Sequence, residues 1–512
     1  MALAWGGSAF GSTPPTTSPA SIPSWSVYHG DPAGSGVAAT VTSVDLSSPA
    51  WTSSALDGQL YGEPLVSDER VYVATENDTV YALSATTGAV LWSTHLGAPV
   101  PSGSLPCGDI SPTVGVTGTP VIDQTRAELF VVADELVNGT PAHQLVGLST
   151  ATGKTELNQN VDPAGSTPAA LLQRTGLTLD AGHVVFGYGG NFGDCSTYHG
   201  WVMSVPEAGG ATATFEVDSA TGDSQGAVWM GGAAPVVDTD NNIWVTAGNG
   251  SVTSPSQAYD DSDSVLELSP SLALEHYFSP SSWASDNARD LDFSTGVALL
   301  ADGQVVAASK SRTVFLLNGS SLGGIGGQQA QLGDACGTVI DGGLAVEGST
   351  VYLPCLSGPI AVQTTDSPAG LRLLWSSSVG GGPPIVAGGL VWTIGSNGVL
   401  YGLRPTSGAV QEQATIGAPA NHFPTPSVGA GLLLAPSAER VVAFTTASSA
   451  PAPTPRTTTS SGPPTTVPST VPPAQPGGAS RWVIAAAIVG GIAVLGVVAW
   501  LVRRRRGRQR GA

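Results

Sequence analysis

The chain has 512 residues, long enough to bury a large core, and its 67 Gly and 39 Pro fit a chain that turns often. Its formal net charge is −20 at pH 7. Because an acidic surface of this kind repels phosphate, the composition excludes nucleic acid as a partner.

The first residues do not form a complete export signal. Residues 1–4 lack a basic region and a hydrophobic stretch of useful length, although Ala2-Leu3-Ala4 resembles the small-x-small end of a signal peptide. We therefore expect the true start of the protein to lie upstream of Met1, and we treat residues 1–24 as a leader remnant or a disordered segment.

A unit of short strands and turns returns, with drift, from about residue 61 to residue 444. In its clearest copy, strand 70–74 and alternating strand 80–83 precede Thr87-Gly88 and a third strand that ends at Trp92. The clearest second copy lies at residues 389–410, and looser copies lie at residues 118–154, 184–188, 242–246, 305–317, 350–353 and 431–444. The strands are too short and too regularly spaced for helices, so the sequence predicts an all-β, eight-bladed propeller over residues 25–447.

The last unit is incomplete, because it stops at Phe444 without a Thr-Gly turn and a third strand. Residues 44–51 hold a strand and a Trp but no preceding hairpin. We expect this N-terminal segment to supply the missing outer strand and so close the ring, which protects sheet edges that would otherwise be exposed.

The C-terminal part of the chain predicts a membrane anchor. Residues 448–480 are rich in Pro, Thr and Ser and are typical of an extended stalk. The membrane helix is predicted over residues 481–502, in which an apolar run of 21 residues starts at Trp482, and four arginines open the basic tail 503–512. A buried core helix is the alternative, but a stalk before the apolar run and arginines directly after it are typical of a membrane-spanning helix. Under the positive-inside rule the tail is cytoplasmic, so we expect a single-pass protein of the cell membrane with an extracellular propeller.

Four cysteines are an even number in a domain placed outside the cell, which favours disulfides. Cys336 and Cys355 flank one strand unit, which indicates a bridge within a blade. That leaves Cys107 and Cys195 for a bridge between neighbouring blades. A zinc site is disfavoured, since no Cys-x-x-Cys or His spacing supports it.

The unit with strands 70–74 and 80–83, Thr87-Gly88 and Trp92 resembles the pyrroloquinoline quinone (PQQ) repeat, over roughly residues 25–444. This repeat occurs in quinoprotein alcohol dehydrogenases and also in scaffold lipoproteins that bind no cofactor. The repeat therefore implies the fold but does not decide the chemistry.

Three local matches resemble the dehydrogenases more closely. Asn249, in Thr246-Ala247-Gly248-Asn249, looks like the Asn that binds the calcium of the quinone. Asp292 matches the catalytic Asp better than Asp290 does, and Lys310 looks like the residue that contacts the quinone oxygens. The resemblance thus implies PQQ and Ca²⁺ as cofactors, with Asp292 as the base that takes an alcohol proton.

The chain also departs from the dehydrogenases. Where the family has a calcium-binding Glu, this chain offers only the shorter Asp194, and Trp229 is an approximate match for the stacking Trp. No two cysteines are adjacent and no Cys-x-x-Cys-His haem motif exists.

Each of these residues also has a plain structural interpretation. Asn249 lies in a Gly-Asn-Gly turn, and Asp292 and Lys310 lie in loops, where charged side chains are usually solvated. The acidic stretch 259–264 resembles a solvated loop more than a calcium loop, since it lacks the Gly and terminal Glu of an EF-hand.

The sequence therefore favours a binding or scaffolding module at the cell envelope. Its expected ligand is a small molecule or an envelope protein, and we expect a monomer. The inserts 251–264 and 279–293 are expected to crowd one face and shape the ligand site. The alternative is a PQQ- and Ca²⁺-dependent dehydrogenase that oxidises an alcohol or a sugar, and a third possibility is a former enzyme that has lost the ion site.

Overall fold

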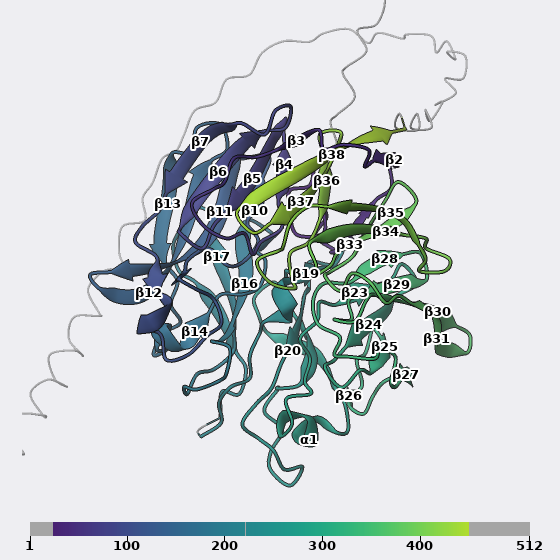
Figure 1. The fold of residues 1–512 in the computed structure, drawn as a ribbon. Helices are drawn as coiled ribbons and strands as arrows, with labels where there is room; N and C mark the ends of the chain where they lie inside the picture. Colours follow the sequence, from purple (N-terminus) through teal and green to yellow (C-terminus); the bar gives the residue numbers. More distant parts are fainter. Residues whose placement is uncertain (1–23, 221, 450–512) are drawn as a thin grey trace, which may run out of the picture. The chain divides into compact units, whose positions relative to one another are not determined.

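Eight β-sheets of four or five strands follow one another as the blades of a propeller (Figure 1). The computed structural model describes residues 24–220 and 222–449. The predicted all-β, eight-bladed propeller is confirmed. Each blade is built from strands that are neighbours in the sequence, as short alternating segments joined by tight turns require.

The first four blades run from Leu65 to Ser279. The first consists of β4 (Leu65–Ser67), β5 (Arg70–Ala74), β6 (Thr79–Ser84) and β7 (Val90–His95). The second consists of β10 (Val121–Asp123), β11 (Glu128–Val137), β12 (Thr140–Ser149) and β13 (Thr155–Asn160). The third consists of β14 (Leu171–Leu172), β15 (Thr178–Asp180), β16 (His183–Gly190), β17 (Trp201–Pro206) and β18 (Ala213–Glu216). The fourth consists of β19 (Val236–Val237), β20 (Ile243–Ala247), β21 (Ser264–Leu268) and β22 (Leu274–Ser279), with β26 (Gly324–Ile325) added alongside β22.

The last four blades run from Ala298 to Ser448. The fifth consists of β23 (Ala298–Leu299), β24 (Gln304–Ala308), β25 (Val314–Asn318) and β27 (Ala330–Leu332). The sixth consists of β28 (Ala345–Glu347), β29 (Thr350–Leu353), β30 (Ile360–Asp366) and β31 (Ala369–Ser376). The seventh consists of β32 (Ile385–Ala387), β33 (Leu390–Ile394), β34 (Val399–Leu403) and β35 (Val410–Thr415), with β1 (Val37–Ala38) parallel to β32. The eighth consists of β36 (Ser427–Gly429), β37 (Leu432–Ser437) and β38 (Arg440–Ser448).

Short elements lie between the blades. A two-stranded ribbon of β8 (Val100–Pro101) and β9 (Thr113–Val114) follows the first blade. The helical elements of the described residues are α1 (Trp283–Asn287) and the 3-10 turns η1 (Ser102–Ser104), η2 (Pro168–Ala170) and η3 (Met230–Gly232).

The ring is closed by strands from both ends of the propeller. The N-terminal strands β2 (Val41–Asp45) and β3 (Trp51–Thr52) both pair antiparallel with β38, where Val44 faces Thr446 and Trp51 faces Ala443. Figure 1 shows this junction of the purple and yellow-green ends of the described chain. The expected closure by the segment around residues 44–51 is confirmed.

A Trp on the outer strand of one blade packs against the glycine-containing turn of the next blade. The indole Nε1 of Trp375 donates a hydrogen bond of 2.6 Å to the carbonyl of Pro405. The indole also packs against Gly408, whose positive φ of +66° and closeness to the ring leave no room for a Cβ. Trp92 makes the same contact with the turn of the second blade, through Thr150 and Gly153. The repeated Gly and Trp of the sequence unit are therefore contacts between blades.

We expect Trp375→Phe to lower the free energy of unfolding by about 1 kcal/mol, because the partly buried carbonyl of Pro405 loses its donor while most of the ring packing stays. Urea denaturation of the full chain measures this change. Trp201→Phe is a matched control, since Trp201 is buried but its Nε1 has no hydrogen-bond partner. An equal loss in both variants would show that the hydrogen bond is not what stabilises the junction.

Both predicted disulfides are present. Cys107 is bonded to Cys195 and Cys336 is bonded to Cys355. The first joins the segment that links β8 and β9 to the loop after β16, and the second joins two segments of the sixth blade region. The Cys107–Cys195 bond thus fixes a covering loop beside the third blade.

No helix within residues 24–220 and 222–449 is long and apolar enough to span a membrane. The predicted membrane helix over residues 481–502 lies outside the described residues, as do the basic tail, the leader and the stalk from residue 450 on.

Candidate functional site

Segments that follow the second strands of three consecutive blades carry the residues of the predicted site. Asp194 lies in the loop after β16, Asn249 follows β20 and Lys310 follows β24. Since corresponding strand ends of neighbouring blades lie at the same rim of a propeller, these three side chains are brought together. Asp292 reaches the same place from the 279–293 insert, which contains α1 and leads into β23.

Asp292 is the buried centre of this cluster, with no exposed surface. Its Oδ2 accepts a hydrogen bond of 2.6 Å from the backbone N–H of Asn249. Its Oδ1 lies 3.1 Å from Nζ of Lys310. The backbone N–H of Lys310 also donates to the carbonyl of Asp292, at 2.9 Å. The carboxylate is therefore held on both sides.

Lys310 connects the acidic groups to the aromatic one. Its Nζ lies 2.6 Å from Oδ1 of Asp290 and 5.3 Å from the centre of the Trp229 ring. The side chain of Lys310 is 16% exposed, whereas that of Asp290 is 64% exposed. Lys310 is thus not a solvated loop lysine, and an ammonium ion over an indole face is a favourable pair.

Asp194 and Asn249 form the other edge of the cluster. Nδ2 of Asn249 lies 3.4 Å from Oδ2 of Asp194, and the hydroxyl of Tyr198 donates to Oδ1 of Asp194 at 2.5 Å. Oδ1 of Asn249 is buried without a hydrogen-bond partner. The structure therefore brings together all five candidate residues, Asp194, Trp229, Asn249, Asp292 and Lys310, whose chemical roles stay predictions.

Burial and charge shift the ionisation of the central pair. Burial raises the pKa of Asp292 to about 6, against the opposing effect of the Lys310 charge. Burial would lower the pKa of Lys310, but the charges of Asp292 and Asp290 outweigh it and raise the pKa above its usual value. Lys310 is therefore a fixed positive charge at neutral pH, and Asp292 titrates close to neutrality.

The inserts build one wall of the cluster, as expected. Asp263, at the end of the 251–264 insert, is fully buried and its Oδ1 accepts a 3.1 Å hydrogen bond from the N–H of Phe293. Asp260 is 5% exposed and Ser262 is completely buried. The prediction of a solvated acidic loop over residues 259–264 was wrong, because this loop folds inward against α1, where Asn287 donates to Ser262.

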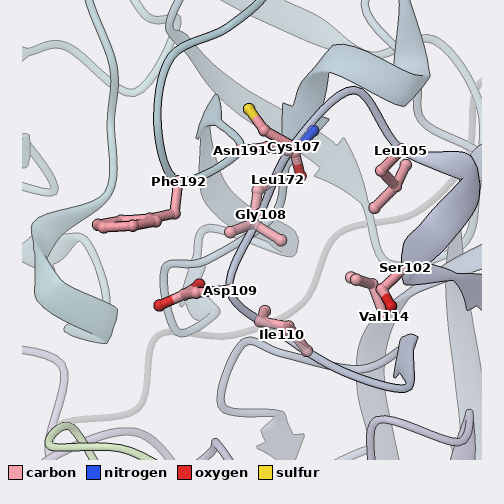
Figure 2. A pocket seen from close by; sticks show the side chains of 10 residues that line it. All are labelled: Ser102, Leu105, Cys107, Gly108, Asp109, Ile110, Val114, Leu172, Asn191 and Phe192. Atoms are coloured by element: carbon pink, nitrogen blue, oxygen red, sulfur yellow. The ribbon is translucent and has the colours of Figure 1, made fainter.

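The disulfide-bonded loop between β8 and β9 lines an apolar hollow (Figure 2). The hollow is lined by Ser102, Leu105, Cys107, Gly108, Asp109, Ile110, Val114, Leu172, Asn191 and Phe192. Phe192 is 68% exposed, so the hollow opens next to an exposed aromatic ring.

Comparisons with known proteins agree with the repeat. Residues 37–267 match the PQQ-repeat family model described as outer membrane protein assembly factor BamB. The resemblance to PQQ-repeat propellers is confirmed. No curated protein matches the chain.

Similar solved structures include three dehydrogenases. The quinohemoprotein alcohol dehydrogenase of Comamonas testosteroni has a TM-score of 0.60 at 16% identity, over 83% of this chain and 80% of that chain. The enzyme ADHIIG of Pseudomonas putida HK5 has a TM-score of 0.60 at 12% identity, over 85% and 82%. A europium-containing methanol dehydrogenase has a TM-score of 0.59 at 12% identity, over 82% and 98%. Identities this low show a shared fold alone.

The cluster of this propeller does not fit a calcium-bound quinone as it is arranged. Calcium takes six to eight oxygen ligands. Here Oδ1 of Asp292 faces Nζ of Lys310, and both oxygens of Asp194 accept hydrogen bonds from within the cluster. Oδ1 of Asn249 is therefore the one side-chain oxygen of these three residues with neither a hydrogen bond nor an ion pair. Nor does any group of three or more His, Cys, Asp or Glu in the described residues have the arrangement of a metal site. The ammonium group of Lys310 also lies over the Trp229 face that a stacked quinone would need.

Sequence reasoning missed a second set of buried acids, on the first and second blades. Glu76, Asp78 and Asp134 are each at most 4% exposed. Burial raises the pKa of Glu76 and of Asp134 to about 7 and that of Asp78 to about 10. None of these acids belongs to a motif. The sequence signals these buried acids only by position: Glu76 and Asp78 lie in the polar turn after β5, and Asp134 lies within β11.

We expect the stability contribution of Glu76 to be lost as pH rises. The folded state keeps a proton on Glu76 up to about pH 7, whereas the unfolded chain releases it near pH 4. Stability from this group is therefore present at acidic pH and is lost as pH rises through the folded pKa. Glu76→Gln should thus raise the free energy of unfolding by about 1–2 kcal/mol at pH 8 and change it little at pH 4.

Urea denaturation of the full chain at the two pH values measures this difference. The exposed Glu69→Gln serves as the control and should show no difference between them. A Glu76→Gln variant that is less stable than the wild type at pH 8 would show that Glu76 is ionised and favourably paired.

Proposed function

We propose that this chain is a non-catalytic binding or scaffolding propeller of the cell envelope. The observation that carries the proposal is the internal pairing of the central cluster. Lys310 forms ion pairs with both Asp290 and Asp292. The carboxylate of Asp194 accepts hydrogen bonds from the side chains of Tyr198 and Asn249. A cluster whose charges are satisfied from within supports a fixed, pre-organised ligand surface.

The comparison with an assembly factor supports the scaffolding side of this proposal, since that family model matches residues 37–267. The ligand would be a small molecule or an envelope protein, and the chain would act as a monomer.

We further propose that residues 481–502 anchor it in the cell membrane as a single-pass protein with the propeller outside. Proteinase added to intact cells should then degrade the propeller and spare a tag at the C-terminus. Protection of the propeller would contradict this orientation.

A PQQ- and Ca²⁺-dependent dehydrogenase is the second candidate. Asp292 favours this function, because burial raises the pKa of its carboxyl group to about 6 and Oδ1 of that group lies 3.1 Å from Nζ of Lys310. Binding of the quinone would require Lys310 to leave Asp292 and the Trp229 face.

One experiment separates the two functions. The full-length chain is incubated with PQQ and CaCl₂, desalted, and examined for retained quinone absorbance and for dye reduction with ethanol or glucose. We expect neither. Stoichiometric quinone with dye reduction that Asp292→Asn abolishes, and that the exposed Asp240→Asn keeps, would overturn the binding proposal and establish the enzyme.

A further inference from the structure

Arg174, just after β14, is a buried cation without a counter-ion. It is 6% exposed, and its Nη2 has no hydrogen-bond partner. It forms no ion pair with any residue that the structure describes, unlike Arg126, Arg289 and Arg312. A guanidinium group stays charged in proteins, so a buried one that lacks a partner carries a large desolvation cost.

The guanidinium group is nevertheless held in place. It lies over the ring of Phe423, with Cζ 4.6 Å from the ring centre. The guanidinium group also lies close to Gly232: a Cβ added at this glycine would lie 2.6 Å from Nη1, and the φ of Gly232 is +86°. Glycine at this position therefore makes the room that Arg174 occupies. Arg174 is fixed before any ligand arrives.

Other buried polar atoms without hydrogen-bond partners belong to residues in the neighbourhood of this cation. Oε1 of Glu76 and Oδ1 of Asp341 have no hydrogen-bond partner. Nε2 of His422 makes no hydrogen bond either and lies 3.6 Å from Oδ2 of Asp341. The charges of Glu76 and Asp341 act on the pKa of Arg174, so these groups lie near it without contacting it.

These residues come from widely separated parts of the ring. Glu76 follows β5 of the first blade, Arg174 follows β14 of the third, and Asp341 precedes β28 of the sixth. His422 lies between the seventh and eighth blades. In a propeller, residues of such distant blades approach one another only near the central axis. The unpartnered atoms therefore converge at the central channel.

We propose that Arg174 binds the carboxylate of a small hydroxylated organic acid, whose hydroxyl groups bond to Glu76, Asp341 and His422. A carboxylate matches the planar fork of donors that a guanidinium group presents. The two nearby carboxylates accept hydrogen bonds from hydroxyl groups and would repel a dianion such as phosphate. Leu172, two residues before Arg174 in the chain, lines the apolar hollow.

This inference rests on the proposed binding function, for which it supplies the ligand class, but the two fail separately. The quinone experiment reports on the Lys310 cluster, whereas titration with an organic acid reports on Arg174.

The test uses gluconate as probe and its uncharged counterpart sorbitol as control, in isothermal titration of the full-length chain at neutral pH. We expect gluconate to bind and sorbitol not to bind. Arg174→Gln should weaken gluconate binding roughly 10- to 100-fold, the usual effect of losing hydrogen bonds to a charged group. Arg312→Gln, at a partly exposed arginine paired with Asp334, should bind as the wild type does.

Three results would overturn the proposal: no binding of millimolar gluconate, equal binding of sorbitol or inorganic phosphate, or unchanged affinity in Arg174→Gln. If Arg174→Gln fails to fold, crystals of the wild-type chain grown with gluconate decide instead. A carboxylate on the Arg174 guanidinium group supports the proposal, and gluconate that is absent or bound elsewhere refutes it.

Discussion

Replacing Lys310 with methionine should lower the free energy of unfolding by about 3–5 kcal/mol at pH 8, because it leaves a buried carboxylate without its cation. Asp292 has no exposed surface and its Oδ1 has only Nζ of Lys310 within ion-pair distance among the described residues. Urea denaturation of the full chain measures the loss.

The loss should shrink at pH 5. Burial already raises the pKa of Asp292 to about 6, and without Lys310 the pKa rises further, so the variant is protonated at pH 5 and no charge is left unpaired. The cost of the variant is thus small below the folded pKa and appears as pH rises through it.

Two further variants make this test specific. Lys154 is the natural control, since its side chain is 72% exposed and, within the part of the chain that the structure describes, forms an ion pair only with Glu156. Lys154→Met should therefore cost well under 1 kcal/mol. The double variant Lys310→Met, Asp292→Asn should recover most of the stability. A Lys310→Met loss equal to that of Lys154→Met, or the same at both pH values, would show that the pair is not a buried ion pair.

Gly248→Ala should destabilise the protein by about 3 kcal/mol, since overpacking a buried site forces neighbours to move. A Cβ at residue 248 would overlap Oδ2 of Asp292. That oxygen cannot retreat freely, because it accepts the 2.6 Å hydrogen bond from the N–H of Asn249. The substitution should therefore also disturb the contact between Lys310 and Trp229, which near-ultraviolet circular dichroism of the full chain reports.

Gly333→Ala is the matched control for this substitution. No atom lies within 4 Å of the Cβ position at residue 333, and its φ is not in the left-handed region. We expect its stability to equal or slightly exceed that of the wild type. If Gly248→Ala is as stable as Gly333→Ala, the close packing of Asp292 against the backbone is refuted.

The propeller could be predicted because its determinants are local. Alternating strands such as β5 and β6, the Thr-Gly turn and the Trp of β7 are written within about 25 residues and then repeat. The closing strands could be predicted as well, since the unit ending at Phe444 lacked its outer strand. Both disulfides followed from four cysteines with one local pair.

The site was only partly predictable. Asp194, Asn249, Asp292 and Lys310 stood out through resemblance to the quinone enzymes, yet the pairing of Lys310 with Asp290 and Asp292 depends on the path of the 279–293 insert, which no local rule gives. Arg174, Glu76 and Asp341 belong to no motif. Their meeting depends on the closure of the ring, which places distant blades on one axis, so only the three-dimensional structure reveals them.

The central claim is that the Lys310 cluster pairs its own charges and holds no quinone with calcium. A crystal structure of the full chain grown with PQQ and CaCl₂ tests it most directly. We expect Nζ of Lys310 to lie between Asp290 and Asp292, near the Trp229 ring, with no ion on Asn249 or Asp194. Calcium bound by Asn249 and Asp194, with a quinone stacked on Trp229 and Lys310 moved aside, would contradict it.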